Sequence, residues 1–534
     1  MSAAEATSAA RRRPPSPIEQ ALALWQRGEL ADAERLLRGM LATDPAQHDA
    51  RHLLGLVCHQ QGRNVEALQL VGAVLERASR SAELLGNYGL ILAALARHQE
   101  ALACFEEALA LSANNLAALR HRASALKRLQ RFEEALSAYE KVLALYPDDI
   151  DALNECGGLL GWLNRPAEAV ACYDRALAVA PRVPELHINK GTALVALNRQ
   201  AEAFECFAAA IAIDPRRAEA HYNQSLVRLR LGDFHDGWRQ YEWRWKKFVG
   251  AGQGRCSAAP LWLGAEPLKD KTILLLAEQG LGDSIQFLRY VPLVAARGAK
   301  VILGVQSPLK ALAATVPGVA LVLGDGEPLP PVDFHCPLLS LPLVFQTELA
   351  TVPANIPYLR APNERLDKWR NSMPANGRLR VGICWAGSAT HLNDRNRSIA
   401  LERFATLLSV PGLDFVSVQK DVSETQSALL RAHGVAQLAQ QCADLADTAA
   451  VLAMLDLVIS VDTSVAHLAG AMGKAVALLL PFAPDFRWLL ERSDSPWYPT
   501  MRLYRQPAIG DWDTPLLRLR QELAAVAGRT AKSR

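Results

Sequence analysis

The sequence predicts an all-helical repeat domain followed by an α/β region, and three observations lead to this fold class. Small residues return every 34 positions through the first half of the chain, which is typical of stacked helix pairs. Short apolar runs alternate with helix-like segments in the second half, a pattern typical of parallel sheets covered on both faces. Aromatic residues make up only 6% because alanine and leucine supply the apolar share, which favours helix.

Composition and charge exclude several classes of protein. A chain of 534 residues is too long for one core, since a domain commonly holds ~100–200 residues. The 58 Lys and Arg residues nearly balance 55 Asp and Glu, and a net charge of +3 gives no general attraction to nucleic acid or membranes. No transmembrane run or secretory signal is visible, and nine cysteines without a C-x-x-C pair fit a reducing compartment. We therefore expect a cytoplasmic protein.

Three series of residues keep the 34-residue spacing. The first is small: Ala21, Gly55, Gly89, Ala123, Gly157, Gly191 and Ser225. A second small series runs from Ala33 to Gly237, and a bulky series runs from Leu37 to Phe207. We expect the small residues to let two antiparallel helices approach closely, and each bulky residue to fill the gap against the next unit.

This periodicity resembles the tetratricopeptide repeat, whose unit is a helix pair of ~34 residues. The resemblance spans residues 14–251 as seven units and follows a short arm, 1–13, that we expect to be disordered. The seventh unit departs from the pattern and carries Trp238, Trp243 and Trp245. We expect these aromatic residues to cap the last apolar face of the array.

Repeat arrays of this kind usually bind peptides in a groove lined by the first helix of each unit. Position six of the unit holds Asn87, Asn189 and Asn223. An asparagine amide both donates and accepts hydrogen bonds, so a row of them can hold an extended peptide backbone. The row is similar to the asparagine ladder of eukaryotic O-linked N-acetylglucosamine transferase. The alternative is solvated polar residues on an exposed helix face.

The second half is predicted to form two lobes, 252–375 and 376–534, the latter ending in a C-terminal helix. The expected strands are Thr272–Ala277, Lys300–Val305, Leu379–Trp385, Phe415–Gln419, Leu457–Val461 and Ala475–Leu480. The expected helices are Asp283–Ala296, Leu401–Leu408, Glu424–His433, Thr448–Asp456 and Val465–Met472. A Pro-rich stretch, 328–342, and a hinge, 353–377, lie between them. Because ligands lie beyond the carboxyl ends of strands in such sheets, we expect the functional residues there.

Three of these strand ends carry chemistry. The first is followed by E-Q-G-L-G-D at 278–283. This motif lacks the third glycine of a dinucleotide-binding site and the lysine of a Walker motif. Asp283 is then either a carboxylate held at a helix start for function or an ordinary N-cap. The second leads into a loop with Gly387, Arg395 and Arg397. Arginine suits phosphate oxygens, and an exposed polar loop is the alternative.

The third strand end is a turn into a helix and holds Asp462, Thr463, Ser464 and His467. Free N–H groups and the positive end of a helix favour an anion at such a turn, and the two hydroxyl groups add donors. The alternative is a capped helix with a satisfied core histidine.

Five motifs together resemble the heptosyltransferase group, glycosyltransferase family nine, and its bacterial branch with tetratricopeptide repeats. They are E-Q-G-L-G-D at 278–283, W-A-G at 385–387, N-D-R-N-R-S at 393–398, D-T-S-V-A-H-L-A-G at 462–470 and P-D-F-R-W at 484–488. The resemblance implies a GT-B fold of two Rossmann-like lobes, with the acceptor at the N-terminal one and the nucleotide sugar at the C-terminal one. It also implies an inverting transfer that uses no metal and no cofactor beyond the donor.

By the same resemblance, Asp283 is the general base, and the turn at 462–467 binds the donor. Ser464 stands where heptosyltransferases usually have glycine, and Arg395 or Arg397 stands in for their donor-site lysine. The leading hypothesis is therefore a glycosyltransferase that moves a sugar to a hydroxyl of a polypeptide held by the repeats. The alternatives are a peptide-binding scaffold with an inactive nucleotide-binding domain and a transferase acting on lipopolysaccharide core sugars.

Overall fold

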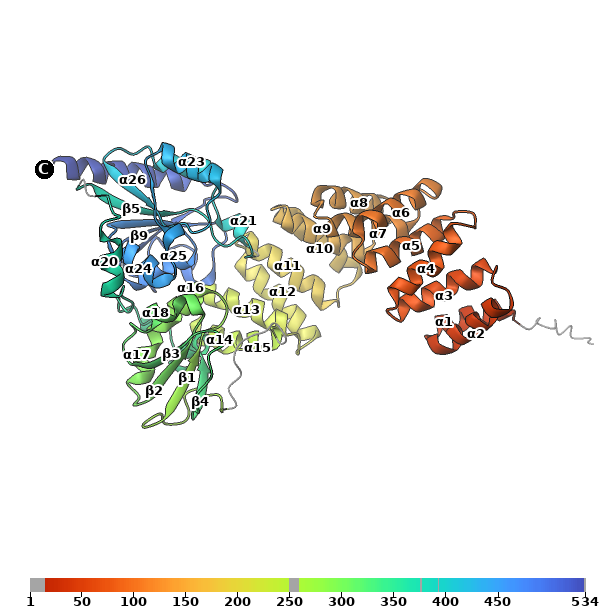
Figure 1. Ribbon diagram of the computed structural model, residues 1–534, viewed down its shortest axis with the longest axis horizontal. Coiled ribbons are helices and arrows are strands. Elements are labelled where there is room, and N and C mark those ends of the chain that lie inside the picture. The colour runs from red at the N-terminus through yellow and green to blue at the C-terminus, as the bar shows by residue number, and fades with distance from the viewer. Residues whose placement is uncertain (1–14, 249–258, 375–376, 392, 533–534) are drawn as a thin grey trace, which may run out of the picture. The chain divides into compact units, whose positions relative to one another are not determined.

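The computed structural model describes residues 15–248, 259–374, 377–391 and 393–532. The chain divides into two compact units, Met1–Asn189 and Lys190–Arg534. Helices alone form the described part of the first unit, and the second unit contains both sheets (Figure 1). The arm expected at 1–13 and the domain boundaries expected at 251 and 375 lie outside the described residues, so they stay predictions. Within the described ranges, no helix combines the length and apolar character needed to cross a membrane.

The first unit is a series of antiparallel helix pairs, one pair for each 34-residue repeat. The pairs are α1 (Pro17–Gln26) with α2 (Leu30–Thr43), α3 (His48–Gln60) with α4 (Asn64–Leu75), α5 (Ala82–Ala94) with α6 (His98–Leu111), α7 (Leu116–Arg128) with α8 (Phe132–Leu145), and α9 (Ile150–Trp162) with α10 (Pro166–Val179). The predicted helical solenoid is therefore present.

The periodic residues explain how each pair packs. A Cβ atom on Gly89 would lie 2.6 Å from the Phe105 ring, and one on Gly157 would lie 2.5 Å from the Tyr173 ring. Only glycine fits at such distances, which confirms the predicted close approach of the two helices. The bulky residue packs on the small residue of its own repeat. It also reaches the next repeat as predicted, since the Phe105 ring lies 5.6 Å from the His121 ring of α7.

The second unit begins with the remaining repeats and continues into the α/β region. Its helical elements are the end of α11 (Pro184–Ala196), α12 (Gln200–Ile213), α13 (Ala218–Leu231), α14 (Phe234–Tyr241) and α15 (Arg244–Lys247). Trp238 of α14 is 2% exposed, and its ring meets Phe287, Phe486 and Trp497 edge to face at 5.8–6.4 Å. Trp238 therefore lies at the end of the array as expected, and residues of the α/β region pack against it and cover this apolar face.

The first lobe contains a four-stranded parallel sheet in the order β3-β2-β1-β4. Its strands are β1 (Thr272–Leu276), β2 (Lys300–Gly304), β3 (Val319–Leu323) and β4 (Phe334–Pro337), and its helices are α16 (Leu281–Phe287), α17 (Val291–Ala295), α18 (Lys310–Ala313) and α19 (Leu341–Val344), with 3-10 segments η1 (Leu288–Tyr290), η2 (Ser307–Leu309), η3 (Leu338–Ser340) and η4 (Leu349–Thr351). Strands β3 and β4 were not predicted. β4 falls inside the Pro-rich stretch and places Pro337 at its last position.

The second lobe contains a six-stranded parallel sheet in the order β10-β9-β8-β5-β6-β7. Its strands are β5 (Leu379–Cys384), β6 (Leu413–Ser417), β7 (Ala436–Gln437), β8 (Leu457–Val461), β9 (Val476–Leu480) and β10 (Met501–Arg505). Its helices are α20 (Asn363–Arg370), α21 (Asp394–Arg397), α22 (Leu401–Phe404), α23 (Glu424–Ala432), α24 (Leu445–Ala453), α25 (Ser464–Ala471) and α26 (Asp513–Lys532), with η5 (Ala405–Leu407), η6 (Ala439–Gln441) and η7 (Phe486–Trp488). The predicted alternation of strand and helix, and the C-terminal helix, are observed.

The segment predicted as a hinge, 353–377, contains helix α20, which is anchored to the second lobe. The Trp369 indole and the Lys368 amine donate to the buried carboxylate of Asp447 in α24, at 3.1 and 2.8 Å. These contacts fix the helix against α24, so the segment is a packed element of the lobe along much of its length.

Candidate functional site

Asp283 lies in the first turn of α16, directly after the end of β1. The helix begins at Leu281, two residues earlier than predicted, so Asp283 is the third helical residue and not the N-cap. Its Oδ2 atom accepts a hydrogen bond from the Gly280 N–H at 2.9 Å, and its Oδ1 atom accepts one from the Arg487 guanidinium. The side chain keeps 17% of its surface exposed, so the carboxylate is held in place and still reachable from solvent.

Arg487 belongs to the P-D-F-R-W motif and is a member of the site for which sequence reasoning gave no role. Its guanidinium donates to Asp283, to Gln286 and to Asp485, the last at 2.7 Å. Burial would lower the pKa of Arg487, but the carboxylates of Asp485 and Asp283 raise it, so the side chain remains a cation. The available signal was an acid and a base two residues apart within an otherwise apolar segment.

Helix α16 of the first lobe packs directly on α25 of the second. A Cβ atom on Gly282 would lie 2.9 Å from Cδ2 of the His467 ring, so the contact requires glycine. Residue 283 and the 462–467 turn therefore lie close together, although they belong to different lobes.

His467 and Asp462 form a buried polar network beneath this turn. The Nδ1 atom of His467 lies 2.9 Å from the Tyr498 hydroxyl, and its Nε2 atom lies 3.7 Å from Oδ1 of Asp462. The Trp488 indole donates to Oδ2 of Asp462 at 2.9 Å and its ring stacks on His467 at 5.3 Å. Burial would raise the pKa of Asp462, but His467 and the indole hold it below its ordinary value.

His467 is buried, its Nδ1 atom bonds to Tyr498, and its Nε2 atom faces the Asp462 carboxylate. These contacts match the alternative of a satisfied core histidine. They leave Asp462 and His467 as supports of the turn, so their direct contact with a donor stays a prediction.

Thr463 and Ser464 form the start of α25. Thr463 is the N-cap residue in extended conformation, and its hydroxyl bonds to the Ser460 hydroxyl at 3.1 Å instead of capping the helix. Ser464 is the first helical residue and is partly exposed. Because the first N–H groups of a helix have no partner within it, this end can accept an anion.

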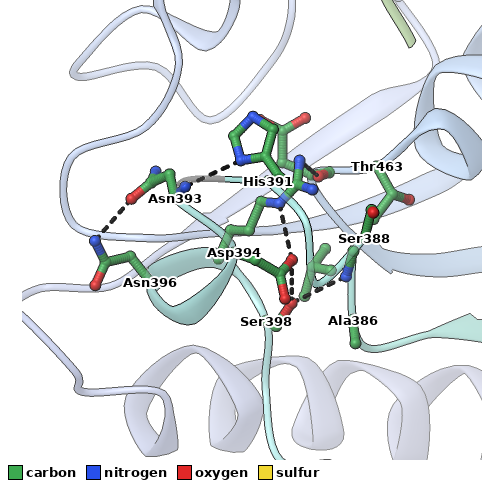
Figure 2. Close-up of polar contacts among 12 residues, drawn as sticks. Ala386, Ser388, His391, Asn393, Asp394, Asn396, Ser398 and Thr463 are labelled. Carbon is green, nitrogen blue, oxygen red and sulfur yellow. Dashed lines mark hydrogen bonds and ion pairs between the residues drawn. The ribbon is translucent and has the colours of Figure 1, made fainter. Parts of the chain in front are cut away.

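The loop after β5 contacts the same turn (Figure 2). The Gly387 N–H donates to the Ser398 hydroxyl at 2.9 Å, and that hydroxyl donates to Asp394 at 2.8 Å. Arg397 donates from Nε to Asp394 at 3.3 Å and from Nη1 to the Asp462 carbonyl oxygen at 3.0 Å. Arg395 is exposed on the same loop. Arg397, one of the two candidate cations, is thus fixed against the turn.

The three asparagines predicted to bind peptide are half-buried and engaged with neighbouring side chains. The amide nitrogen of Asn87 lies 3.0 Å from Nε2 of His52, and that of Asn189 donates to Oδ1 of Asn154 at 2.9 Å. Asn223 accepts a hydrogen bond from Lys247 of α15 at 3.3 Å. The partners of Asn87 and Asn189 lie in the preceding repeat, so these amides link repeats, and their role toward a peptide stays a prediction.

Comparison with known proteins identifies the class of the N-terminal region. Residues 18–83, 80–148 and 163–218 match models of the tetratricopeptide repeat. Together with the observed helix pairs, these matches show that this region is built of tetratricopeptide repeats.

Particular relatives are more distant. Protein FlbA of Caulobacter vibrioides (strain ATCC 19089 / CIP 103742 / CB 15) is 24% identical over 320 residues, which cover 55% of this chain and 53% of FlbA, so the chain spans about half the length of this relative. Among solved structures, the C-terminal part of a TPR repeat-containing protein from Cytophaga hutchinsonii is 13% identical with a TM-score of 0.38 and covers 42% of this chain and 93% of its own. A tetratricopeptide repeat protein from Parabacteroides merdae ATCC 43184 is 18% identical with a TM-score of 0.37 and covers 45% and 93%. Pseudomonas aeruginosa pilF is 22% identical with a TM-score of 0.35 and covers 39% and 95%.

Proposed function

We propose that the chain is an inverting, metal-independent glycosyltransferase of the GT-B type that moves a sugar from a nucleotide sugar to an acceptor hydroxyl. One observation carries the proposal: a continuous series of contacts joins Asp283 to the start of α25. Asp283 bonds to Arg487, the adjacent Trp488 bonds to Asp462, and the Asp462 carbonyl oxygen bonds to Arg397. These contacts link a carboxylate to a helix start that is suited to an anion, which supports the proposal of one site.

In this proposal, the start of α25 holds the diphosphate of the donor. The helix N–H groups and the Ser464 hydroxyl donate to phosphate oxygens, and Arg397 supplies a positive charge beside them. The leaving nucleoside diphosphate gains negative charge as the glycosidic bond breaks. Donors that are already oriented toward that charge stabilise the transition state without reorganising.

Asp283 takes the role of general base. Its two hydrogen bonds occupy part of a carboxylate that offers about four lone-pair positions, so an acceptor hydroxyl can still donate to it. The carboxylate removes the hydroxyl proton as the oxygen attacks the anomeric carbon from the face opposite the diphosphate. A single displacement of this kind inverts the anomeric configuration.

The acceptor in this proposal is a polypeptide held by the repeats. Tetratricopeptide repeats mediate protein interactions. The amide oxygen of Asn87 has no hydrogen-bond partner among the described residues, so it offers an acceptor to a peptide N–H. Asn87→Ala should raise the KM for a protein acceptor and leave the KM for the donor unchanged.

The ion pair between Asp283 and Arg487 favours a second candidate, a peptide-binding scaffold that binds nucleotide without catalysis. Transfer assays with a panel of nucleotide sugars and mass spectrometry of candidate acceptors separate the two. Loss of one general base typically costs ~10²–10⁴-fold, so Asp283→Asn should slow transfer by about that factor and still bind nucleotide. The matched control is Asp367→Asn, the same change at an acid 70% exposed on α20.

An Asp283→Asn variant as fast as wild type would remove Asp283 as the base. Calorimetry that shows nucleotide binding by wild type, without any transfer across the panel, would establish the scaffold instead.

A further inference from the structure

The terminal repeat carries a buried arginine outside the site described above. Arg244 of α15 has no exposed surface. Its Nη2 atom donates to Oε1 of Glu278 at 2.8 Å and to the Ser340 hydroxyl at 2.7 Å, and its Nη1 atom donates to Glu242. Burial would lower the pKa of Arg244, but the carboxylates of Glu278 and Glu242 raise it. The guanidinium is thus a cation held in place by hydrogen bonds to Glu278, Ser340 and Glu242.

Glu278 is the first residue of the six-residue segment that ends in Asp283. Burial raises its pKa, and the charge and hydrogen bonds of Arg244 oppose that rise. The contact therefore ties a repeat helix to the segment at its start. The carboxylate lies five residues before the proposed base.

The next residue is tied to the repeat as well. The Gln279 amide donates to the Tyr241 hydroxyl at 3.1 Å. The backbone of Gln279 has φ of +60°, a left-handed conformation that residues with side chains adopt uncommonly and that the surroundings must hold. Tyr241 and Arg244 of the terminal repeat are thus placed to hold the segment in this conformation.

We propose that Arg244 is a positioning residue of the transfer reaction, which acts by holding Glu278 and so sets the place of Asp283. The inference rests on the proposed function. It makes the terminal repeat a part of the reaction site as well as the end of a binding array. Arg244 acts through Asp283 and touches neither the donor nor the acceptor.

The test uses the full chain and measures kcat and KM for the donor. Arg244→Lys keeps the charge but loses the fork that bonds Glu278 and Ser340 together. We expect a fall in kcat of about tenfold or more with little change in KM, and a smaller fall for Tyr241→Phe, which removes only the hydroxyl. Arg228→Lys is the matched control, because Arg228 lies in the same repeat and bonds to Asp233 and Gln240.

A second pair of variants separates positioning from general stability. Residues that act through one another give non-additive effects, so Arg244→Lys should cost far less in an Asp283→Asn background than in wild type. Arg244→Met with Glu278→Leu and Glu242→Gln removes all three charges of the cluster, so none is left unpaired. This variant should fold, by its melting curve, and remain slow.

Three results would overturn the inference: an unchanged kcat in Arg244→Lys, an equal loss in the Asp283→Asn background, or full activity in the charge-free variant. If one of these results is found while wild type still transfers sugar and Asp283→Asn does so slowly, only the role of Arg244 is refuted and the proposed function stands. Wild type without transfer would overturn both.

Discussion

Gly282→Ala tests the contact between the two lobes most directly. The new methyl carbon would lie 2.9 Å from Cδ2 of His467, closer than carbon atoms pack. The histidine ring cannot move aside easily, because Tyr498, Asp462 and Trp488 hold it on three sides. Overpacking of this kind costs about 1–3 kcal/mol, whereas alanine in a helix gains about 0.5–1 kcal/mol over glycine. The midpoints of these two ranges predict a net loss of stability of about 1 kcal/mol.

The measurement is urea unfolding of the full chain followed by tryptophan fluorescence, which reports the second unit through Trp238, Trp488 and Trp497. Gly528→Ala is the matched control, since nothing lies within 4 Å of a Cβ atom at that helical position, and it should be neutral or slightly stabilising. Gly282→Ala should also slow transfer, because the displaced helix start carries Asp283. If both variants unfold at the same urea concentration, α16 and α25 do not pack as described.

Two further predictions concern the second lobe. A Cβ atom on Gly387 would collide with the Arg397 guanidinium and lie 2.6 Å from Asp394. Gly387→Ala should therefore weaken nucleoside diphosphate binding by about tenfold, which is the effect of one lost charged hydrogen bond. Calorimetry that shows wild-type affinity would contradict this prediction. Burial would raise the pKa of Asp447, but Lys368 and its other donors lower it from 3.8 to about 2. A carboxyl group with a lowered folded-state pKa stabilises the fold above its unfolded pKa, and this stability is lost as pH falls from about 4 toward 2. Asp447→Asn should therefore be less stable than wild type at pH 7, by about 2 kcal/mol, and lose less on acidification; parallel melting curves across pH would refute the assignment.

The repeats could be predicted because their decisive contacts are local. Gly89 and Phe105 lie sixteen positions apart, and the later repeats keep this spacing. The periodicity therefore predicted the close approach of the two helices, although it did not predict that the bulky residue packs on the small one. Missed elements lacked such a pattern. β4 is short and ends in Pro337, and α20 lies within a stretch rich in proline and charge, so neither presents the alternation or the amphipathic spacing of its type.

The places of the candidate site residues in the fold could be predicted where the backbone decides them, whereas their side-chain partners could not. Asp283 follows β1 and the 462–467 turn follows β8, so each lies at the carboxyl edge of its own parallel sheet. The partner of Asp283 is Arg487, 204 positions away, and that of His467 is Tyr498. Neither pairing has a local signature. The hydrogen bond of His467 to Tyr498 therefore appeared only with the structure.

The aromatic contacts of Trp238 have a consequence for how the chain can be rearranged. One indole ring touches Phe287 of the first lobe and Phe486 of the second, so the final repeat belongs to the interior shared by both. An exchange of repeats for a foreign array must therefore be made upstream of α13. A junction placed after α13 would replace α14 and so remove the Trp238 side chain that packs against both lobes.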